Sequence, residues 1–258
     1  MGKIIAIANQ KGGVGKTTTS INLGACLSGL GKRILLVDID PQGNSSSGLG
    51  IIKQQVHRSI YDGIINNIPV EEIVQPSKYK NLEILPANID LAGAEVELVS
   101  VMAREQVLKN LLQPVRNYYD YILIDCPPSL GLLTINALTT SDSVLVPIQC
   151  EFFALEGLSQ LINTVQLVQR NLNAKLEIEG VVLTMYDGRT TLSKQVAAEV
   201  QRTFKTKVYR TVIPRSIRLG EAPSYGQSIV EYAPNSSPSQ AYMSLAQELN
   251  EANQTRSV

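Results

Sequence analysis

Short apolar runs alternate with longer amphipathic segments along almost the whole chain. Each run is largely free of polar residues, which is typical of a strand covered on both faces of a parallel sheet. Such alternation predicts βαβ units, and so an α/β fold with a doubly wound, mostly parallel sheet and helices on both faces. The predicted strands are residues 3–9, 33–40, 81–87, 119–127, 143–149, 177–185 and 209–214, and the predicted helices are residues 16–30, 91–113, 131–140, 154–172, 191–204 and 238–252.

The chain of 258 residues is long enough for one large α/β domain or two small ones. No internal repeat, low-complexity block or linker interrupts the pattern. Two polar segments, residues 41–50 and 232–240, are predicted surface loops that are too short to separate domains. We therefore expect residues 1–258 to form a single domain. Because the first predicted strand begins at residue 3, we expect no N-terminal helix-turn-helix domain.

Composition narrows the possible partners. Lysine plus arginine and aspartate plus glutamate balance at 23 each, so contact with a polyanion would need a local basic patch. Cys26, Cys126 and Cys150 form no Cys-x-x-Cys pair, which argues against disulfides, a zinc site and export and favours buried apolar roles. No apolar stretch approaches the ~18 residues that a membrane-spanning helix needs. We expect a soluble cytoplasmic protein that makes no membrane contact.

The sequence IANQKGGVGKTTTSINLG, residues 7–24, joins the first predicted strand to the first predicted helix. Backbone N–H groups at such a junction can converge on phosphate oxygens, and Gly12, Gly13 and Gly15 allow the close approach. Lys16 would reach the β- and γ-phosphates, and the Thr17 hydroxyl would bind Mg²⁺. The alternative is a glycine-rich turn with a solvated Lys16. The flanking strand and helix favour a phosphate-binding loop.

Aspartates end two of the predicted strands: Asp38 and Asp40 in RILLVDIDPQGN, and Asp125 in YDYILIDCPPS. The carboxyl ends of parallel strands face the crevice where such sheets bind ligands. Asp125 fits a carboxylate that holds Mg²⁺ directly or through water. Asp40 fits an acceptor that orients the attacking water. A cap or turn role is the alternative for any one aspartate.

The loop departs from the pattern G-x-x-x-x-G-K-[ST], because Gln10 replaces the first glycine and a second lysine, Lys11, follows it. Three segments, KGGVGKTTT, LLVDIDPQGN and ILIDCPPSLGLLTINAL, together resemble the ParA/Soj family of chromosome and plasmid partition ATPases. This family belongs to the deviant Walker A (ParA/MinD) class of P-loop NTPases, whose signature K-G-G-x-G-K-[ST] carries the extra lysine. The likeness runs from the first strand to about residue 232.

The resemblance implies ATP and Mg²⁺ as ligands and a role for each matching residue. Lys11 would be presented outward and contact the phosphates held by the other subunit of an ATP-dependent homodimer, as an arginine finger does elsewhere; a solvated lysine is the alternative. Thr18 would meet the α-phosphate, and Asp125 would hold the metal through water. The implied catalytic residues are Lys11, Lys16 and Asp40, and the implied nucleotide-binding residues are Lys11, Gly12, Gly13, Val14, Gly15, Lys16, Thr17, Thr18, Met185, Pro214 and Arg215, the last three near the adenine.

A basic stretch lies late in the chain. Residues 189–220 contain one acid, Glu199, and eight bases, which are Arg189, Lys194, Arg202, Lys205, Lys207, Arg210, Arg215 and Arg218. No aromatic residues interleave them in a way that suggests base stacking, so contact would be with phosphates and insensitive to sequence. The resemblance implies that Arg189 and Arg218 bind double-stranded DNA. An ordinary solvated helix face is the alternative.

The resemblance implies a nucleotide switch for chromosome or plasmid partition: the ATP-bound dimer would bind DNA, and hydrolysis stimulated by a ParB-type partner would release it. The protein would then be nucleoid-associated. A MinD-like positioning ATPase is one alternative, although the chain ends SLAQELNEANQTRSV, which is no basic membrane-binding helix. A metabolic enzyme with the same loop is another, but no second polar constellation marks a substrate pocket, and His57 is expected at the surface.

Overall fold

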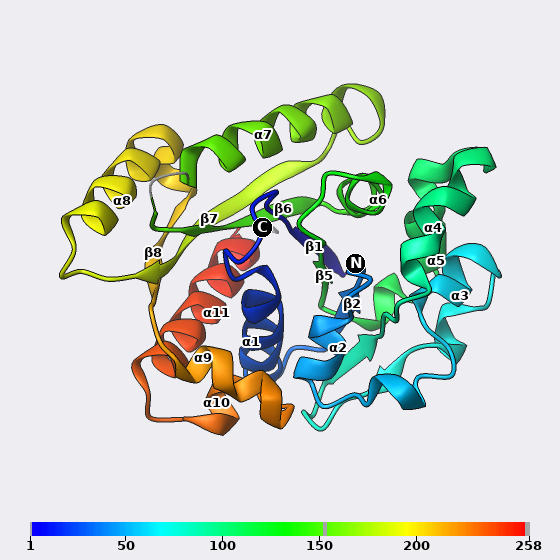
Figure 1. The fold of residues 1–258 in the computed structure, drawn as a ribbon, viewed down its shortest axis with the longest axis horizontal. Helices are drawn as coiled ribbons and strands as arrows, with labels where there is room; N and C mark the ends of the chain where they lie inside the picture. The colour runs from blue at the N-terminus through cyan, green and yellow to red at the C-terminus, as the bar shows by residue number, and fades with distance from the viewer. Residues whose placement is uncertain (1, 152–153, 256–258) are drawn as a thin grey trace.

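One eight-stranded sheet organises the chain (Figure 1). The computed structural model describes residues 2–151 and 154–255. The strand order is β3-β4-β2-β5-β1-β6-β7-β8, and every neighbouring pair is parallel except β3 with β4. The strands are β1 (Lys3–Ile7), β2 (Ile34–Asp38), β3 (Gln75–Pro76), β4 (Leu82–Leu85), β5 (Tyr121–Asp125), β6 (Ser143–Gln149), β7 (Glu177–Tyr186) and β8 (Val208–Pro214). The predicted α/β class is confirmed.

Helices connect the strands in the alternation that the sequence predicts. The α-helices are α1 (Lys16–Gly29), α2 (Asn44–Gly48), α3 (Ile60–Ile65), α4 (Leu91–Glu97), α5 (Val107–Leu112), α6 (Leu132–Thr140), α7 (Ala154–Asn171), α8 (Thr191–Phe204), α9 (Arg218–Glu221), α10 (Ile229–Tyr232) and α11 (Ser237–Thr255). Short 3₁₀ turns are η1 (Lys53–Gln55), η2 (Val70–Glu72), η3 (Leu98–Ser100), η4 (Arg104–Gln106), η5 (Arg116–Tyr118), η6 (Lys205–Lys207) and η7 (Ala222–Tyr225).

The sheet divides the apolar interior into two cores, and the central strand β1 contributes to both. Successive side chains of a strand point to opposite faces of the sheet. Accordingly Ile4 and Ala6 belong to one core, and Ile5 and Ile7 belong to the other. Because both faces are buried, neither can be polar, which explains why the strand sequences are continuous apolar runs.

Different helices cover the two faces of the sheet. The core that contains Ile4 includes buried residues of α3 to α8, such as Leu108, Leu161 and Val200. The core that contains Ile5 includes residues of α1 and α11, such as Leu27 and Leu245. Figure 1 shows α1 and α11 side by side in the lower half of the view and α7 across the top. The doubly wound arrangement therefore places α1, which follows the glycine-rich loop, against the middle of the sheet.

Strand register brings the predicted acidic residues together. Ile7, the last residue of β1, pairs with Asp125 at the end of β5, and Asp125 pairs in turn with Asp38 at the end of β2. Parallel strands that end at the same level form one edge, from which their connections depart. Residues 8–15, Asp38 and Asp125 consequently meet at this edge.

Two segments differ from the sequence-based prediction. Residues 41–50 are not simply a surface loop, because residues 44–48 form α2 and Ser45 and Ser46 are fully buried. The predicted helix over residues 91–113 is broken: Val101 is extended, and Ala103 has φ of 54° in the left-handed region. Helix α4 therefore ends at Glu97, and a separate helix, α5, begins at Val107.

We expect Leu245→Ala to lower the free energy of unfolding by about 2–5 kcal/mol, because Leu245 is fully buried in the core between α11 and the sheet. Denaturant titration followed by circular dichroism measures the change. Leu167→Ala is the control: Leu167 on α7 is 57% exposed, so its replacement should change the free energy by less than about 0.5 kcal/mol. Equal effects at the two positions would contradict the assigned core.

Candidate functional site

The loop between β1 and α1 adopts a conformation that depends on glycine. Gly13 and Gly15 have φ of 74° and 90°, in the left-handed region that residues with a Cβ rarely adopt. Gly15 is the N-cap of α1, and its carbonyl accepts the first bond of the helix from Thr19 N at 2.8 Å. The first N–H groups of α1 therefore stay free to bind an anion in front of the loop.

Two side-chain hydrogen bonds anchor the loop to neighbouring strands, and a third lies within the loop. Asn9 Nδ2 donates to Pro147 O at 2.7 Å, and Asn9 Oδ1 accepts from Lys11 N at 3.0 Å. Thr184 Oγ1, near the end of β7, donates to Val14 O at 2.8 Å. These bonds hold the loop in shape. Sequence reasoning missed Asn9 and Thr184, whose only signal was a polar residue at the end of an apolar run.

Lys16 lies inside the site. Its side chain is buried, and Nζ donates to Lys11 O of the same loop at 3.1 Å. Burial lowers the pKa of Lys16, while the charges of Asp125 and Asp40 act in the opposite direction. The ammonium group thus borders the loop with an acceptor that a phosphate oxygen can replace.

Lys11 is held by its own chain. Its Nζ lies 3.6 Å from Glu151 Oε2, and the side chain is 30% exposed. A Cβ added to Gly157 at the start of α7 would lie 3.5 Å from Lys11 Cβ, so the backbone of α7 approaches the lysine closely. The expected outward presentation of Lys11 is therefore only partly met, because Glu151, which follows β6, draws the side chain toward α7. Glu151 was not singled out by sequence reasoning.

Asp125 is fully buried behind the loop. Ser20 Oγ donates to its Oδ1 at 2.9 Å, and Ser45 Oγ donates to its Oδ2 at 2.8 Å. Burial raises the pKa of Asp125, and hydrogen bonds from Ser45, Thr17 and Ser20 oppose that rise. The carboxylate is hydrogen-bonded to Thr17, so it orients the Thr17 hydroxyl, which lines the cavity in front of the loop.

Asp38 and Asp40 have different environments. Asp38 is fully buried, and its Oδ2 accepts from both N and Oγ of Ser46 at 2.8 Å. Burial and the neighbouring Asp125 carboxylate raise the pKa of Asp38. Asp40 instead faces the pocket in front of the loop, with its Oδ1 accepting from Gln42 N at 2.9 Å. Asp38 therefore fixes the start of α2, while Asp40 remains available to a ligand.

Two adjoining cavities form the candidate site. The first, about 360 Å³, lies in front of the loop and is lined by Gly12, Gly13, Gly15, Lys16, Thr17, Thr18, Asp40, Gln42, Asn44, Pro128 and Met185. The second, about 310 Å³, is mainly apolar and includes Gly15, Thr18, Met185, Pro214 and Arg215 in its lining. Gly15, Thr18 and Met185 line both. The structure thus brings Met185, Pro214 and Arg215 beside the loop.

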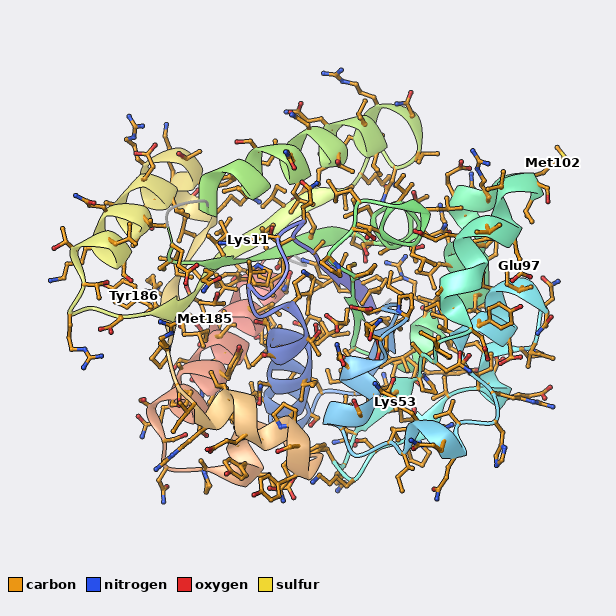
Figure 2. The ribbon with its side chains drawn as sticks, in the orientation of Figure 1. Lys11, Lys53, Glu97, Met102, Met185 and Tyr186 are labelled. Atoms are coloured by element: carbon orange, nitrogen blue, oxygen red, sulfur yellow. The ribbon has the colours of Figure 1, made fainter. Side chains whose placement is uncertain are left out.

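Met185 has an unusual backbone at the junction of the two cavities. Its φ is 51°, in the left-handed region that is uncommon for residues other than glycine. The register of β7 against β8 also shifts between Leu183 and Tyr186. Figure 2 shows Met185 and Lys11 in the same part of the molecule. Residues such as Ile217, Leu219 and Tyr242 complete the apolar lining and were missed, since no local pattern marks them.

The basic stretch is partly neutralised by acids, all of which except Glu199 lie outside residues 189–220. Arg189 donates from Nε and Nη2 to the Asp187 carboxylate at 2.9 and 2.8 Å. Four more bases lie within 4.0 Å of a carboxylate: Arg202 with Glu199, Lys207 with Glu177, Arg210 with Glu248, and Arg215 with Glu151. Arg218, at the start of α9, is exposed and has no ion pair within the described residues. The segment therefore presents less positive charge than its composition suggests.

The remaining candidates take structural or surface positions. Cys26, Cys126 and Cys150 are buried free thiols, and His57 is exposed. Across residues 2–151 and 154–255, no group of three or more His, Cys, Asp or Glu residues is placed to hold a metal ion. No helix in this described part of the chain is long and apolar enough to cross a membrane.

Comparisons with known proteins show the family to which the chain is similar. The model of the AAA domain family matches residues 2–178. The sporulation initiation inhibitor protein Soj of Bacillus subtilis is 61% identical, with 96% of this chain and 98% of Soj aligned. The chromosome partitioning protein ParA of Myxococcus xanthus is 51% identical over 96% of this chain and 88% of its own length. The chromosome-partitioning ATPase Soj of Treponema pallidum is 49% identical over 96% and 97%.

Solved structures share the fold. A structure of cobyrinic acid a,c-diamide synthase from Mycobacterium smegmatis with bound ADP and magnesium superposes with a TM-score of 0.84 at 37% identity, covering 96% of this chain and 93% of that one. The cell division ATPase MinD of Pyrococcus furiosus superposes with a TM-score of 0.80 at 27% identity, covering 98% and 100%. With the glycine-rich loop, the two aspartate-ended strands and these full-length similarities, the chain belongs to the ParA/Soj family of chromosome-partitioning ATPases.

Proposed function

We propose that this protein is an ATP-driven switch for chromosome or plasmid partition. In the proposed cycle, the ATP-bound protein dimerises and binds DNA without sequence preference, and a ParB-type partner stimulates hydrolysis and release. The observation that carries the proposal is the polar cavity in front of the loop, where Lys16, Thr17 and Asp40 face one space that adjoins an apolar cavity. Such a pair of cavities suits a triphosphate joined to a purine base.

The described residues fit ATP and Mg²⁺. The free N–H groups at the start of α1 and the Lys16 ammonium would hold phosphate oxygens, and Thr18 lies where an α-phosphate would pass. Thr17 would ligate Mg²⁺, with Asp125 behind it accepting hydrogen bonds and acting through water. Met185, Pro214 and Arg215 would line the adenine. When bound, Mg²⁺ supplies positive charge to the β- and γ-phosphates.

Asp40 is the proposed residue that orients the attacking water. It borders the cavity beside the loop, and its Oδ1 is fixed by Gln42 N at 2.9 Å. A fixed acceptor near the transferring phosphate can align water without a large change in geometry. Asp38 is less suitable, because the N–H and hydroxyl of Ser46 occupy its carboxylate in the interior.

Lys11 is the proposed residue that acts across the dimer. A cation supplied by one subunit to the triphosphate of the other would hold the two together and stabilise charge during hydrolysis. In the single chain Lys11 lies 3.6 Å from Glu151, an ion pair at a partly exposed position. Such pairs contribute little to stability, so a partner triphosphate can displace Glu151. Dimerisation would thus exchange one contact of Lys11 for a stronger one.

DNA binding is proposed for the surface that carries Arg189 and Arg218. These residues belong to the turn between β7 and α8 and to α9, both on the left-hand side of Figure 1. Arg218 is unpaired among the described residues, so its charge is available to a phosphate. Arg189 must first break its ion pair with Asp187 before it can bind a phosphate. The two arginines should therefore contribute unequally, and the switch would be nucleoid-associated only while dimeric.

The proposed roles separate in three variants of the nucleotide site. Asp40→Ala should bind ATP and dimerise but hydrolyse it at least about a hundredfold more slowly, because water loses its acceptor. Lys16→Ala should lose nucleotide affinity itself. Lys11→Ala should bind ATP as a monomer. Nucleotide titration, size-exclusion chromatography with ATP and phosphate release together measure these three properties.

The matched control for Lys11→Ala is Lys80→Ala, an exposed lysine in the turn before β4. It should dimerise with ATP like the unmodified protein. If Asp40→Ala stayed monomeric with ATP while Lys11→Ala dimerised normally, the two assignments would have to be reversed.

DNA affinity should require ATP, ignore sequence and fall steeply with salt. If each subunit neutralises about three phosphates, the slope of log affinity against log salt should be about −5, and Arg218→Ala should flatten it by about one to two. Arg189→Ala should have the smaller effect, and Asp187→Asn should raise affinity because it frees Arg189. Gel-shift titrations on two unrelated duplexes measure these changes.

Arg58→Ala is the control for the arginine variants, because Arg58 is exposed but pairs with Glu72 in another part of the chain. Its affinity for DNA should not change. Equal affinity with ADP and with ATP, or a marked preference for one duplex, would reject the switch. Hydrolysis that responds to cobyrinic acid, and to neither DNA nor a ParB-type protein, would instead favour a metabolic enzyme.

A further inference from the structure

The segment of residues 89–102, which contains α4 and η3, exposes several large apolar side chains, which is unusual for a surface segment. Ile89, Val96, Val99 and Met102 are 67%, 76%, 63% and 93% exposed. The inner face of the same segment already supplies the core with Leu91, Ala94 and Leu98, which are fully buried. A surface helix normally turns polar residues outward. Contact with the protein's own core therefore does not explain the exposed residues.

The exposed residues follow a regular spacing. Ile89, Ala92, Val96, Val99 and Met102, which we call the α4 seam, are separated by three, four, three and three positions, and all five are exposed. Ile89 to Val99 lie on the consecutive helical turns that α4 and η3 form, where steps of three and four place residues in one narrow line, the pattern that one further helix packs against. Met102 lies beyond these turns, after the extended Val101. Figure 2 shows Glu97 and Met102 at the right-hand edge of the molecule, far from Lys11.

Acidic groups flank the α4 seam. Asp90 is next to Ile89 and Glu97 is next to Val96 in the sequence. Both carboxylates act on Tyr61, whose hydroxyl donates to Glu97 Oε1 at 3.1 Å. Asp62 on α3 lies close enough to act on Tyr61 together with these two carboxylates. The neighbouring base, Arg104, is engaged with Val99 O at 2.7 Å and with Glu105. The border of the seam is therefore negative.

This charge selects among the possible occupants. A second copy paired by a two-fold axis would place the same acidic border against itself, and like charges in those positions oppose pairing. An anionic membrane surface would be repelled for the same reason. A helix with its own apolar stripe and basic flanking residues would bury the apolar residues of the seam and form ion pairs with the carboxylates.

The other side of α4 contacts the nucleotide site. Glu95 Oε1 accepts a hydrogen bond from Leu133 N at 3.4 Å, at the start of α6. A Cβ added to Gly131 would lie only 2.3 Å from the same oxygen, so Glu95 packs directly on the segment that follows Asp125. Pro128 of that segment lines the cavity in front of the loop. Between a partner bound at the α4 seam and the nucleotide there would thus be only α4 and the segment that contains Pro128.

We propose that the α4 seam is a docking site for a basic amphipathic helix of another protein. The inference concerns a surface that the proposed partition cycle does not use, and it stands whether or not that cycle is correct. Binding is driven by burial of the seam, and its specificity comes from the acidic border.

The test uses two labelled helical peptides of about three heptads, both with leucine in the apolar stripe, one flanked by lysine and the other by glutamate. Fluorescence anisotropy with the full chain measures their affinity. The lysine peptide should bind at least about tenfold more tightly than the glutamate peptide. Val96→Asp should weaken the lysine peptide by about tenfold or more, because it places a charge in the seam.

Leu167→Asp is the matched control, since Leu167 is an exposed apolar residue on α7. It should leave binding unchanged. The double substitution Asp90→Lys with Glu97→Lys reverses the charge of the border, so the variant should bind the glutamate peptide more tightly than the lysine peptide. Non-specific hydrophobic binding or partial unfolding would not produce this change. Circular dichroism verifies that each variant is folded.

Three results would overturn the inference. The first is that neither peptide binds, and the second is that both bind equally and the reversed border does not change this. The third is that sedimentation of the ligand-free protein shows a dimer which Val96→Asp abolishes, because the seam would then be an interface between copies. Weakening of peptide binding by Leu167→Asp to the same extent as by Val96→Asp would count against it as well.

Discussion

Two carboxylates buried side by side, Asp38 and Asp125, constrain the centre of this protein. They are neighbours in the register of β2 and β5, and burial raises the pKa of both. Buried acids are tolerated only where hydrogen-bond donors surround them. Ser20 and Ser45 supply donors to Asp125, and Ser46 supplies two to Asp38. The positions of α1 and α2 follow from these bonds, and with them the geometry of the phosphate-binding loop.

Sequence alone could locate the parts of the site that depend on local structure. Lys16 and Thr17 follow from the spacing of the loop, and Asp125 follows from its place at the end of an apolar run. Met185, Pro214 and Arg215 came from resemblance, since the 310 Å³ cavity that includes them is assembled from distant segments. Residues 44–48 were misjudged because serines normally indicate a loop, and only the two buried carboxylates explain why these are interior.

Long-range contacts account for the other differences. Glu151 lies far from Lys11 in the sequence, so no local pattern could show that it would draw the lysine toward α7. Similarly, the bases of residues 189–220 look unopposed in sequence, whereas Glu177, Glu248 and Glu151 approach three of them from other elements. The number of basic residues in a segment is therefore an upper limit on the positive charge that the folded surface presents.

The hydrogen bond from Lys16 to the Lys11 carbonyl has a consequence for the kinetics of ligand entry. The lysine has an acceptor within its own loop, and Asn9 and Thr184 hold the loop in shape. Entry of a ligand therefore exchanges one acceptor of Lys16 for another and requires no ordering of the chain. The entropy that an unstructured loop loses on binding is absent here. Association should thus be a single bimolecular step, with an observed rate that rises in proportion to ligand concentration and shows no plateau from a slow rearrangement.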